Sequence, residues 1–410
     1  MIAVIQTILL VLAGFFLVYL AMLSALALVA PKHRDLKTLK VRKFAVVVPA
    51  HDEESTIAKT LGSLNSLDYP RGLFDLIVIA DNCEDRTAEI ARSVGAQVFE
   101  RRNLRERGKG YALRWCFDLL LSRRAAYDAV VVIDADTVAS DNLLCVFNAY
   151  LERGAQAIQC SDLVEPGLES WSTEVTRIGF TLYNYVRPLG RRVLGCSAGL
   201  RGNGMCFTSE ILQKIPWQSY SLTEDLEYGL ELLLNDVQVV FAPEARVFAT
   251  MPQYSSNAET QRTRWETGRF PLLRKYAGRF LWIAVKRMSL KAFDAFVDLV
   301  TQAFVNLIAF VLLMLCLNLF LWVLGVEQAL WFVWWWSCLM GAGLFHVLVG
   351  LYAARADRSM YLALLQVPRF AVWKLMLYSK LIKRSRTEQW IRTAREDTVG
   401  SPVPDETIHQ

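Results

Sequence analysis

The stretch Ala129-Val130-Val131-Val132-Ile133-Asp134-Ala135-Asp136 decides the fold class of this 410-residue chain. Its apolar part predicts a strand that is buried on both faces, which is typical of a parallel sheet covered by helices. The two acidic residues follow directly where this strand ends. Ligands of parallel α/β sheets bind beyond the carboxyl ends of the strands. We therefore predict that Asp134 and Asp136 lie at the functional edge of such a sheet.

Strand and helix signals alternate on both sides of this stretch. Apolar runs predict strands over 44–48, 76–80 and 238–241, and the patterns between them predict helices over 55–66, 86–94, 110–123 and 141–152. Such alternation favours an α/β fold with a mostly parallel sheet. We assign residues 40–280 to a single domain of this class.

The composition excludes several classes of protein. Apolar residues make up 54% of the chain and charged residues 21%, which excludes intrinsic disorder and collagen. The net charge is +5, and much of the basic excess flanks apolar runs, so no nucleic-acid partner is predicted. The eight cysteines form no Cys-x-x-Cys pair, which favours a reduced compartment without structural zinc.

Three uncharged runs predict transmembrane helices over 2–30, 299–325 and 329–354. Basic residues are concentrated in 32–43 and again in 355–386. By the positive-inside rule, the N-terminus lies outside a cytoplasmic membrane and the 40–280 domain lies in the cytosol. Membrane lipids are therefore predicted partners of the chain.

The C-terminal region carries two further expectations. Residues 359–383 are apolar but interrupted by charge and proline, which favours an amphipathic helix in the cytosolic membrane interface. A broken fourth span is the alternative. Residues 398–410 are predicted to be disordered.

Acidic residues also follow the first two predicted strands, in 51–54 and 81–85. We interpret Asp85 as a helix N-cap. Asp134 and Asp136 are different, because residues two apart on an extended chain point the same way. Paired hard carboxylates select Mg²⁺ or Mn²⁺, which such sites share with substrate phosphates.

The same pair supports a second hypothesis. In phosphohydrolases of the haloacid-dehalogenase type, the first aspartate of such a motif is phosphorylated and the second is the acid/base. Asp134 would then be the nucleophile. That motif normally opens its domain, whereas here other strand-end motifs precede it, so this function is kept as an alternative.

Two motifs lie further along the chain. Thr223-Glu224-Asp225 opens an amphipathic stretch that runs to about residue 235. Its simplest interpretation is a helix cap at Thr223 or Asp225. Gln261-Arg262-Thr263-Arg264-Trp265 follows, and alone it fits a basic interfacial helix.

In this order and spacing, the motifs resemble the membrane-integrated family 2 glycosyltransferases, which include cellulose, chitin, hyaluronan and poly-N-acetylglucosamine synthases and ceramide glucosyltransferases. The resemblance covers roughly 40–280 and implies one nucleotide-sugar-binding domain of the GT-A type. The residues that it implicates are Glu53 and Asp81 for the uridine, Lys109 for the nucleotide, Asp134 and Asp136 for the nucleotide sugar and its metal, Asp225 as general base, and Gln261, Arg264 and Trp265 for closure over diphosphate and acceptor.

The chemistry of sugar transfer agrees with these roles. A divalent cation, Mg²⁺ or Mn²⁺, and basic side chains can neutralise the departing diphosphate of a UDP-sugar. One carboxylate can take the proton of the acceptor hydroxyl. A single base implies direct displacement with inversion, so an α-linked donor gives a β-linked product. The sequence departs from the family at Asn82, where many members carry a second aspartate.

The acceptor is predicted from a polar pattern near the second span. Asp294, Asp298, Gln302 and Asn306 recur every four residues, as one slowly winding stripe of a helix would. Such a stripe is either a helix–helix contact or a groove that leads the acceptor into the bilayer. The Gln-x-x-Arg-Trp motif favours a growing exported β-glycan, with a homo-oligomer or an export partner. Single addition to a lipid is the alternative.

Overall fold

The computed structural model describes residues 2–31, 36, 38–122, 127–166, 171–249, 255–301, 303–367 and 369. For residues 2, 171, 172 and 255–267 only the backbone is described.

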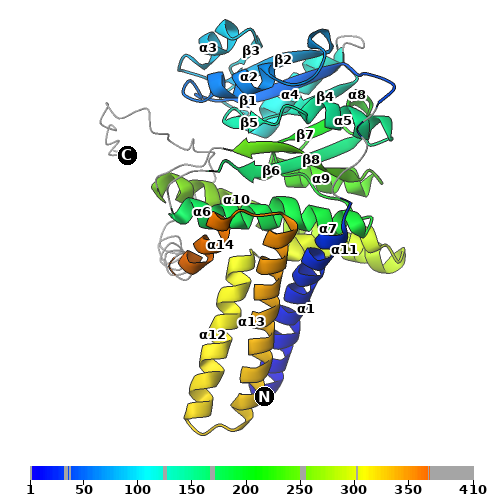
Figure 1. Cartoon of the computed structure of the whole chain (residues 1–410). Helices are drawn as coiled ribbons and strands as arrows, with labels where there is room; N and C mark the ends of the chain where they lie inside the picture. Colours follow the sequence, from blue (N-terminus) through cyan, green and yellow to red (C-terminus); the bar gives the residue numbers. More distant parts are fainter. Residues whose placement is uncertain are drawn as a thin grey trace, which may run out of the picture.

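The described residues contain one eight-stranded sheet. In the view of Figure 1, a layer of helices lies below the sheet, and three long helices extend downward from that layer. The strands are β1 Phe44–Ala50, β2 Phe74–Asp81, β3 Gln97–Arg101, β4 Ala129–Val132, β5 Thr137–Ala139, β6 Ala157–Val164, β7 Met205–Thr208 and β8 Val239–Ala249. Their order is β3-β2-β1-β4-β7-β6-β8-β5. Strands β3, β2, β1 and β4 run parallel, as do β6 and β8, whereas β7 and β5 pair antiparallel with their neighbours. The predicted α/β fold with a mostly parallel sheet is confirmed.

Alternate residues of the central strands face two different cores. Phe44, Val46 and Val48 of β1 pack with one cluster, and Ala45 and Val47 pack with the other. Successive side chains of a strand point to opposite faces, so an uninterrupted apolar run fits a sheet covered on both sides. The helices on the first face are α2 Ile57–Asn65, α3 Thr87–Ser93 and α5 Leu143–Glu152, and those on the second are α4 Lys109–Ser122, α8 Ser209–Lys214 and α9 Glu224–Leu234.

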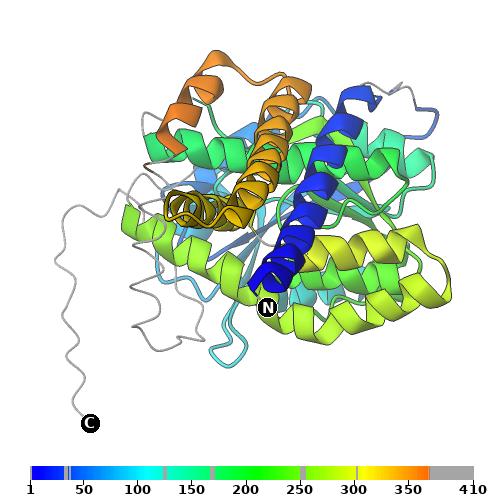
Figure 2. The ribbon, with the colours of Figure 1, turned by 90° about the horizontal axis from the view of Figure 1, so that it is seen from below.

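A layer of helices separates the sheet from the long helices (Figures 1 and 2). It comprises α6 Trp171–Phe180, the π-helical segment η2 Thr181–Val186, α7 Arg187–Val193, α10 Ser255–Lys286 and α11 Leu290–Val300. Tyr185 of η2 packs edge-on against Phe241 of β8, with ring centroids 6.1 Å apart. On the opposite side of the layer, Gly190 of α7 lies against the backbone of Leu23.

Three helices are long and apolar enough to cross a membrane by length and composition. They are α1 Ile2–Val29, α12 Phe304–Val323 and α13 Gln328–Ala353. All three project from the same side of the domain, and the start of α1 and the α12–α13 connection lie together at the far end (Figure 1). After α13 come α14 Arg358–Ala363 and the short segment η3 Leu364–Gln366. The rest of the predicted 359–383 helix and all of 398–410 lie outside the described residues, apart from residues 367 and 369.

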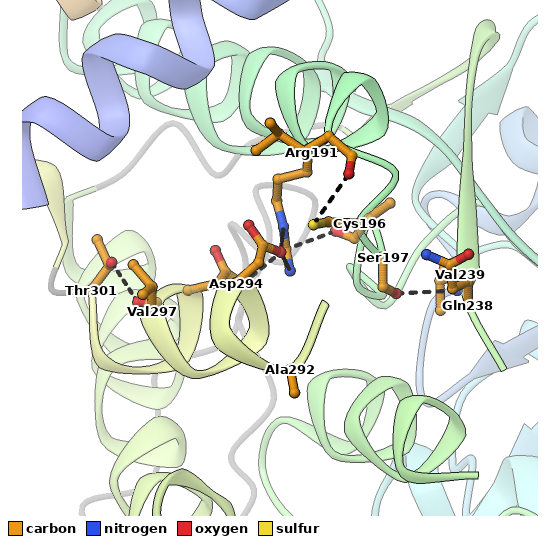
Figure 3. Close-up of polar contacts among 12 residues, drawn as sticks. Arg191, Cys196, Ser197, Gln238, Val239, Ala292, Asp294, Val297 and Thr301 are labelled. Carbon is orange, nitrogen blue, oxygen red and sulfur yellow. Dashed lines mark hydrogen bonds and ion pairs between the residues drawn. The ribbon is translucent and has the colours of Figure 1, made fainter. Parts of the chain in front are cut away.

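The predicted continuous polar stripe is wrong. Helix α11 ends at Val300, Thr301 has extended backbone with ψ 116°, and α12 begins only at Phe304. Asp294 and Asp298 therefore lie on α11 and not on a span. Their carboxylates form ion pairs with Arg191 of α7, at 2.6 and 3.1 Å (Figure 3). Charged pairs of this kind are costly in lipid, which explains why the apolar helix starts after them. Asn306 is on α12, and Gln302 lies outside the described residues.

The contact between α7 and α1 gives a first prediction. A Cβ atom at Gly190 would lie 2.4 Å from the backbone oxygen of Leu23, so Gly190→Ala forces the two helices apart. We expect this variant to lose about 1–3 kcal/mol of unfolding free energy, as overpacked sites do. Gly179→Ala is the matched control, because a Cβ at this helical position meets nothing within 4 Å. It should gain roughly 0.5–1 kcal/mol. Thermal unfolding of the full chain in lipid measures both, and equal stabilities of the two variants would contradict the close contact.

Candidate active site

The ends of β1 and β2 bring the first two acidic motifs together. Asp81 is buried, and its Oδ1 accepts a hydrogen bond from Arg101 Nη1 at 2.7 Å. Burial raises the pKa of Asp81, and the hydrogen bond and charge of Arg101 oppose part of that rise. His51 Nδ1 lies 2.7 Å from the carbonyl oxygen of Asp81, which joins the two strand ends. The carboxyl ends of β1 and β2 thus lie together at one edge of the sheet, as the sequence predicted.

Asn82, the position that departs from the family pattern, and Asp52 shape the loops. Both have a φ of 53°, in the left-handed region that aspartate and asparagine tolerate best among non-glycine residues. Asp52 Oδ1 accepts from the backbone N–H of Glu84 at 2.7 Å, and Asn82 Oδ1 accepts from that of Asn103 at 2.8 Å. Asn82 therefore ties the end of β2 to the loop after β3.

Asp85 and Glu53 also take part in this loop pairing. Asp85 Oδ1 accepts from the backbone N–H of Thr87 at 2.9 Å, so its side chain bonds the first residue of α3. The predicted N-cap position is off by one residue, because the N-cap of α3 is Arg86. Glu53 Oε2 accepts from the hydroxyl of Thr56 at 2.8 Å. Among the described residues, Asp52, Cys83 and Asp85 place ligand atoms within 4.8 Å of one another, but both carboxylates already accept backbone hydrogen bonds. We therefore assign no metal to that group.

Three side chains from different elements meet around Gly202. Lys109, at the start of α4, forms an ion pair with Asp134 and donates to the carbonyl oxygen of Gly202 at 2.6 Å. Asp225, in the first turn of α9, approaches from the other direction. A Cβ built on Gly202 would lie 3.4 Å from Asp225 Oδ2 and 3.8 Å from Lys109 Nζ. Gly202 has a φ of +83°, so both the space and the backbone favour glycine there.

The charges of this centre influence one another. Burial raises the pKa of Asp225, although Lys109 and Arg201 lower it in part. Burial alone would lower the pKa of Lys109, but the carboxylates of Asp134 and Glu224 outweigh this effect and raise it. A carboxylate with a raised pKa next to a protonated amine is suited to accept a proton from a neutral hydroxyl.

Sequence reasoning missed one acidic residue, Asp162 of β6. It is buried, and its pKa lies well above the ordinary value because of burial and because of the nearby charge of Asp134. Asn203 links the two residues, since its Nδ2 donates to Asp162 Oδ1 at 3.2 Å and its Oδ1 accepts from the backbone N–H of Asp134 at 3.1 Å. The strand register shifts between Cys160 and Ser161, just before Asp162. Such irregularities re-aim the side chains that follow.

The carboxylates at the end of β4 fit a divalent cation. Asp134 and Asp136 both raise the pKa of Asp162, so the charges of these two carboxylates act at one place, and burial keeps Asp162 toward its neutral form. Lys109 pairs with Asp134 and compensates only part of that charge. Hard oxygen donors in excess over basic groups are the donor set that Mg²⁺ or Mn²⁺ takes in sites shared with phosphates.

The segment with the Gln-x-x-Arg-Trp motif passes next to α9. Its backbone belongs to α10, and the side chains of Gln261, Arg264 and Trp265 lie outside the described part of the chain. One turn further along, the carbonyl oxygen of Gly268 accepts from the hydroxyl of Thr223 at 3.1 Å. Thr223 occupies the N-cap position of α9, as predicted, but its side chain makes no cap hydrogen bond to α9 and bonds α10 instead. This contact carries α10 past the N-terminal turn that holds Asp225.

With this geometry established, comparison with known proteins identifies the domain. The model of the family described as glycosyltransferase-like family 2 matches residues 42–268. The chain belongs to this family. The family 2 assignment confirms the predicted resemblance and gives no support to the phosphohydrolase alternative.

The similar proteins include one that is named as a glycolipid synthase and one that is named as a polysaccharide synthase. The chain is 28% identical over 236 residues to a β-monoglucosyldiacylglycerol synthase of Trichormus variabilis, covering 55% of this chain and 48% of that protein. It is 23% identical over 283 residues to a poly-β-1,6-N-acetyl-D-glucosamine synthase of Staphylococcus epidermidis, covering 66% of this chain and 63% of that protein. The chain thus spans about half to two thirds of the length of these relatives.

A solved structure matches almost the whole chain. It is the mannosyltransferase PcManGT from Pyrobaculum calidifontis, in complex with GDP-Man and Mn²⁺. The TM-score is 0.55 at 15% sequence identity, and the match covers 92% of this chain and 97% of the other. At this identity the likeness shows the fold alone, and it confirms the predicted GT-A-type domain with flanking helices.

Proposed function

We propose that this chain is a membrane-embedded, metal-dependent, inverting glycosyltransferase that moves a sugar from a UDP-sugar to an acceptor arriving from the membrane. The observation that carries the proposal is the meeting of Lys109, Asp134 and Asp225 at Gly202. A basic group, a carboxylate that would hold a metal and a half-buried carboxylate with a raised pKa are the parts that such a transfer requires.

The donor side is assigned to the ends of β1, β2 and β4. Glu53 and Asp81 bind the nucleoside, Lys109 reaches the diphosphate, and Asp134 with Asp136 would hold Mg²⁺ or Mn²⁺. When bound, the cation supplies positive charge to the departing diphosphate. Asp162 and Asn203 keep the Asp134 backbone in place, because Asn203 bonds both residues.

Asp225 is assigned as the general base. It takes the proton of the acceptor hydroxyl while the acceptor oxygen bonds to the anomeric carbon and the bond from that carbon to the diphosphate breaks. The nucleoside diphosphate leaves with the electron pair of the broken bond. A single displacement inverts the anomeric centre, so an α-linked donor gives a β-linked product.

For the acceptor, the ion pairs of α11 favour a lipid that receives a single sugar. Asp294 and Asp298 belonged to a stripe interpreted as either a helix–helix contact or an acceptor groove. Both carboxylates pair with Arg191 of α7, which leaves them engaged between helices and not free to line a polar path for a glycan. The second candidate is the growing exported β-glycan, with an oligomer or export partner, and the N-acetylglucosamine polymer synthase among the relatives favours it.

The proposed topology places the catalytic domain in the cytosol and the N-terminus outside the cytoplasmic membrane. The start of α1 and the α12–α13 connection lie at the same far end of the three long helices, as this topology requires (Figure 1). The layer of α6, α7, α10 and α11 then lies at the cytosolic membrane surface.

A donor screen tests the proposal. The full chain, purified in lipid, is given UDP-glucose, UDP-N-acetylglucosamine or UDP-galactose, with GDP-mannose as a comparison. We expect metal-dependent release of UDP from one of the UDP-sugars and a lipid product that is heavier by one sugar. A ladder of products spaced by one sugar would favour the glycan candidate. Transfer from none of the UDP-sugars would contradict the proposed donor.

A further inference from the structure

A cluster of arginines, of which Arg187 and Arg191 are buried, lies on the membrane side of the active site. This interfacial arginine cluster consists of four arginines with two aspartates and a tyrosine: Arg187, Arg191, Arg201, Arg269, Asp294, Asp298 and Tyr183. Four guanidinium groups thus face two carboxylates.

Two of the arginines have complete partners. Arg191 donates through Nε to Asp294 Oδ2 at 2.7 Å and pairs through Nη1 with Asp298 Oδ2 at 3.1 Å. Arg269 donates to the backbone carbonyl oxygens of Asp298 and Leu299, so it caps the C-terminus of α11. These two residues link α7, α10 and α11. Arg191 is the ion-pair partner of both aspartates.

The other two arginines each keep a buried Nε without a hydrogen-bond partner. Arg187 is only 3% exposed, its Nε has no hydrogen-bond partner, and within the described chain its guanidinium contacts only the ring of Tyr183, at 5.0 Å. Arg201 donates to the Tyr183 hydroxyl at 3.1 Å and to the Ala198 carbonyl oxygen at 3.3 Å, and its Nε is also without a partner. The Asp298 carboxylate acts on both guanidinium groups, but it is already paired with Arg191. Buried N–H donors that stay unpaired in a native fold call for a ligand.

The electrostatic potential around Tyr183 is positive. Burial alone would raise the pKa of Tyr183, but Arg201 and Arg269 lower it below the ordinary value. Asp298 lines a small pocket together with Arg191 and Gly199. Its Oδ1 has no partner, so the pocket also offers one acceptor for a hydroxyl group.

The cluster lies between the catalytic centre and the apolar helices. Arg201 directly precedes Gly202, which lies against Asp225. Arg187 is on α7, where Gly190 touches Leu23 of α1. Tyr183 is next to Leu182, whose side chain meets Gly350 of α13. A molecule that reached both Asp225 and the spans would pass this point.

We propose that Arg187 and Arg201 form a phosphate-binding subsite for the acceptor, which is therefore a lipid that carries a phosphate near the hydroxyl that receives the sugar. This inference rests on the proposed function. Guanidinium groups bind phosphate oxygens through paired N–H donors, which matches two arginines with unused donors. Arg201 acts on Asp225, the proposed base, and Arg187 is on α7, which lies against α1, so we assign the subsite to the acceptor and not to the donor diphosphate.

The experiment measures equilibrium binding of a short-chain phosphatidic acid to the full chain in detergent, without any sugar donor. Diacylglycerol with the same chains and inorganic phosphate are the comparison ligands. The variants are Arg187→Met, Arg201→Met and Arg187→Lys, with Arg274→Ala as control, because Arg274 is an exposed arginine of α10 in the same layer. We expect saturable binding of phosphatidic acid, weakened at least tenfold by either methionine substitution and unchanged by Arg274→Ala.

Thermal unfolding of the same variants separates binding from structure. Arg187→Met removes an unpaired buried charge, so its melting temperature should stay the same or rise while binding is lost. If Arg187→Met does not fold, Arg187→Lys decides, since it should retain more binding than Arg201→Met. Equal binding by all variants, or equal binding of diacylglycerol, overturns the subsite. Equal binding of inorganic phosphate overturns its assignment to a lipid. Release of UDP from sugar donors is measured separately, so failure of the proposed transferase activity is told apart from failure of the subsite.

Discussion

Asp225→Asn is expected to bind UDP as the unaltered chain does and to transfer sugar about 10²–10⁴-fold more slowly, the usual effect of losing a proton-transfer group. The amide keeps the size of the side chain but cannot take the acceptor proton. Because burial raises the pKa of Asp225, the unaltered enzyme should lose activity as the pH falls through a value above the ordinary aspartate range. That acidic limb should be absent from the residual activity of the variant. Sugar transfer and UDP binding are measured across pH on both proteins.

Asp236→Asn is the matched control for this variant. Asp236 is an exposed aspartate just after α9, and its φ of 59° suits asparagine equally well. It changes one carboxylate near the same helix without touching the centre, so its rate and pH profile should equal those of the unaltered chain. A near-normal rate in Asp225→Asn would remove this residue from the mechanism, and a parallel loss of UDP binding would make its role structural.

The donor edge of the site was predictable from local pattern. Apolar strands followed by acidic residues predict where β1, β2 and β4 end, and parallel strands bring those ends to one edge. The approach of Asp225 to Gly202 was not predictable from spacing, since α9 follows β4 only after three further strands. The expectation for Asp225 came from the resemblance to family 2 alone.

The rest of the site has no local sequence signal. Asp162 lies inside a strand and not at a strand end, so no motif marks it in the sequence. The pairing of β6 with β7 brings it near Asn203. The four-residue period placed Asp294 and Asp298 on one helix face, which is correct, but a period does not predict that α11 ends at Val300. Arg191 decides the environment of both aspartates from a different helix, and sequence spacing carries no information about that contact.

Removal of the divalent cation is expected to stop turnover. Metal ions contribute several kcal/mol of charge stabilisation in such sites, so EDTA should lower the rate by roughly a thousandfold or more. Added Mg²⁺ or Mn²⁺ should restore it. Asp136→Ala should be slow at every metal concentration, because the carboxylate that would hold the cation is gone. The rate is followed as UDP release during titration with each metal.

Asp85→Asn is the control that makes the metal result specific. Asp85 belongs to the other acidic group of the described chain, with Asp52 and Cys83. Because its carboxylate serves the backbone N–H groups of Glu54 and Thr87, its variant should keep the metal dependence of the unaltered chain. If full activity persisted in EDTA, the Asp134–Asp136 pair would not be a metal site. If Asp85→Asn alone abolished the response to metal, the cation would lie at the β1–β2 loops, and Lys109 would remain the main partner of Asp134.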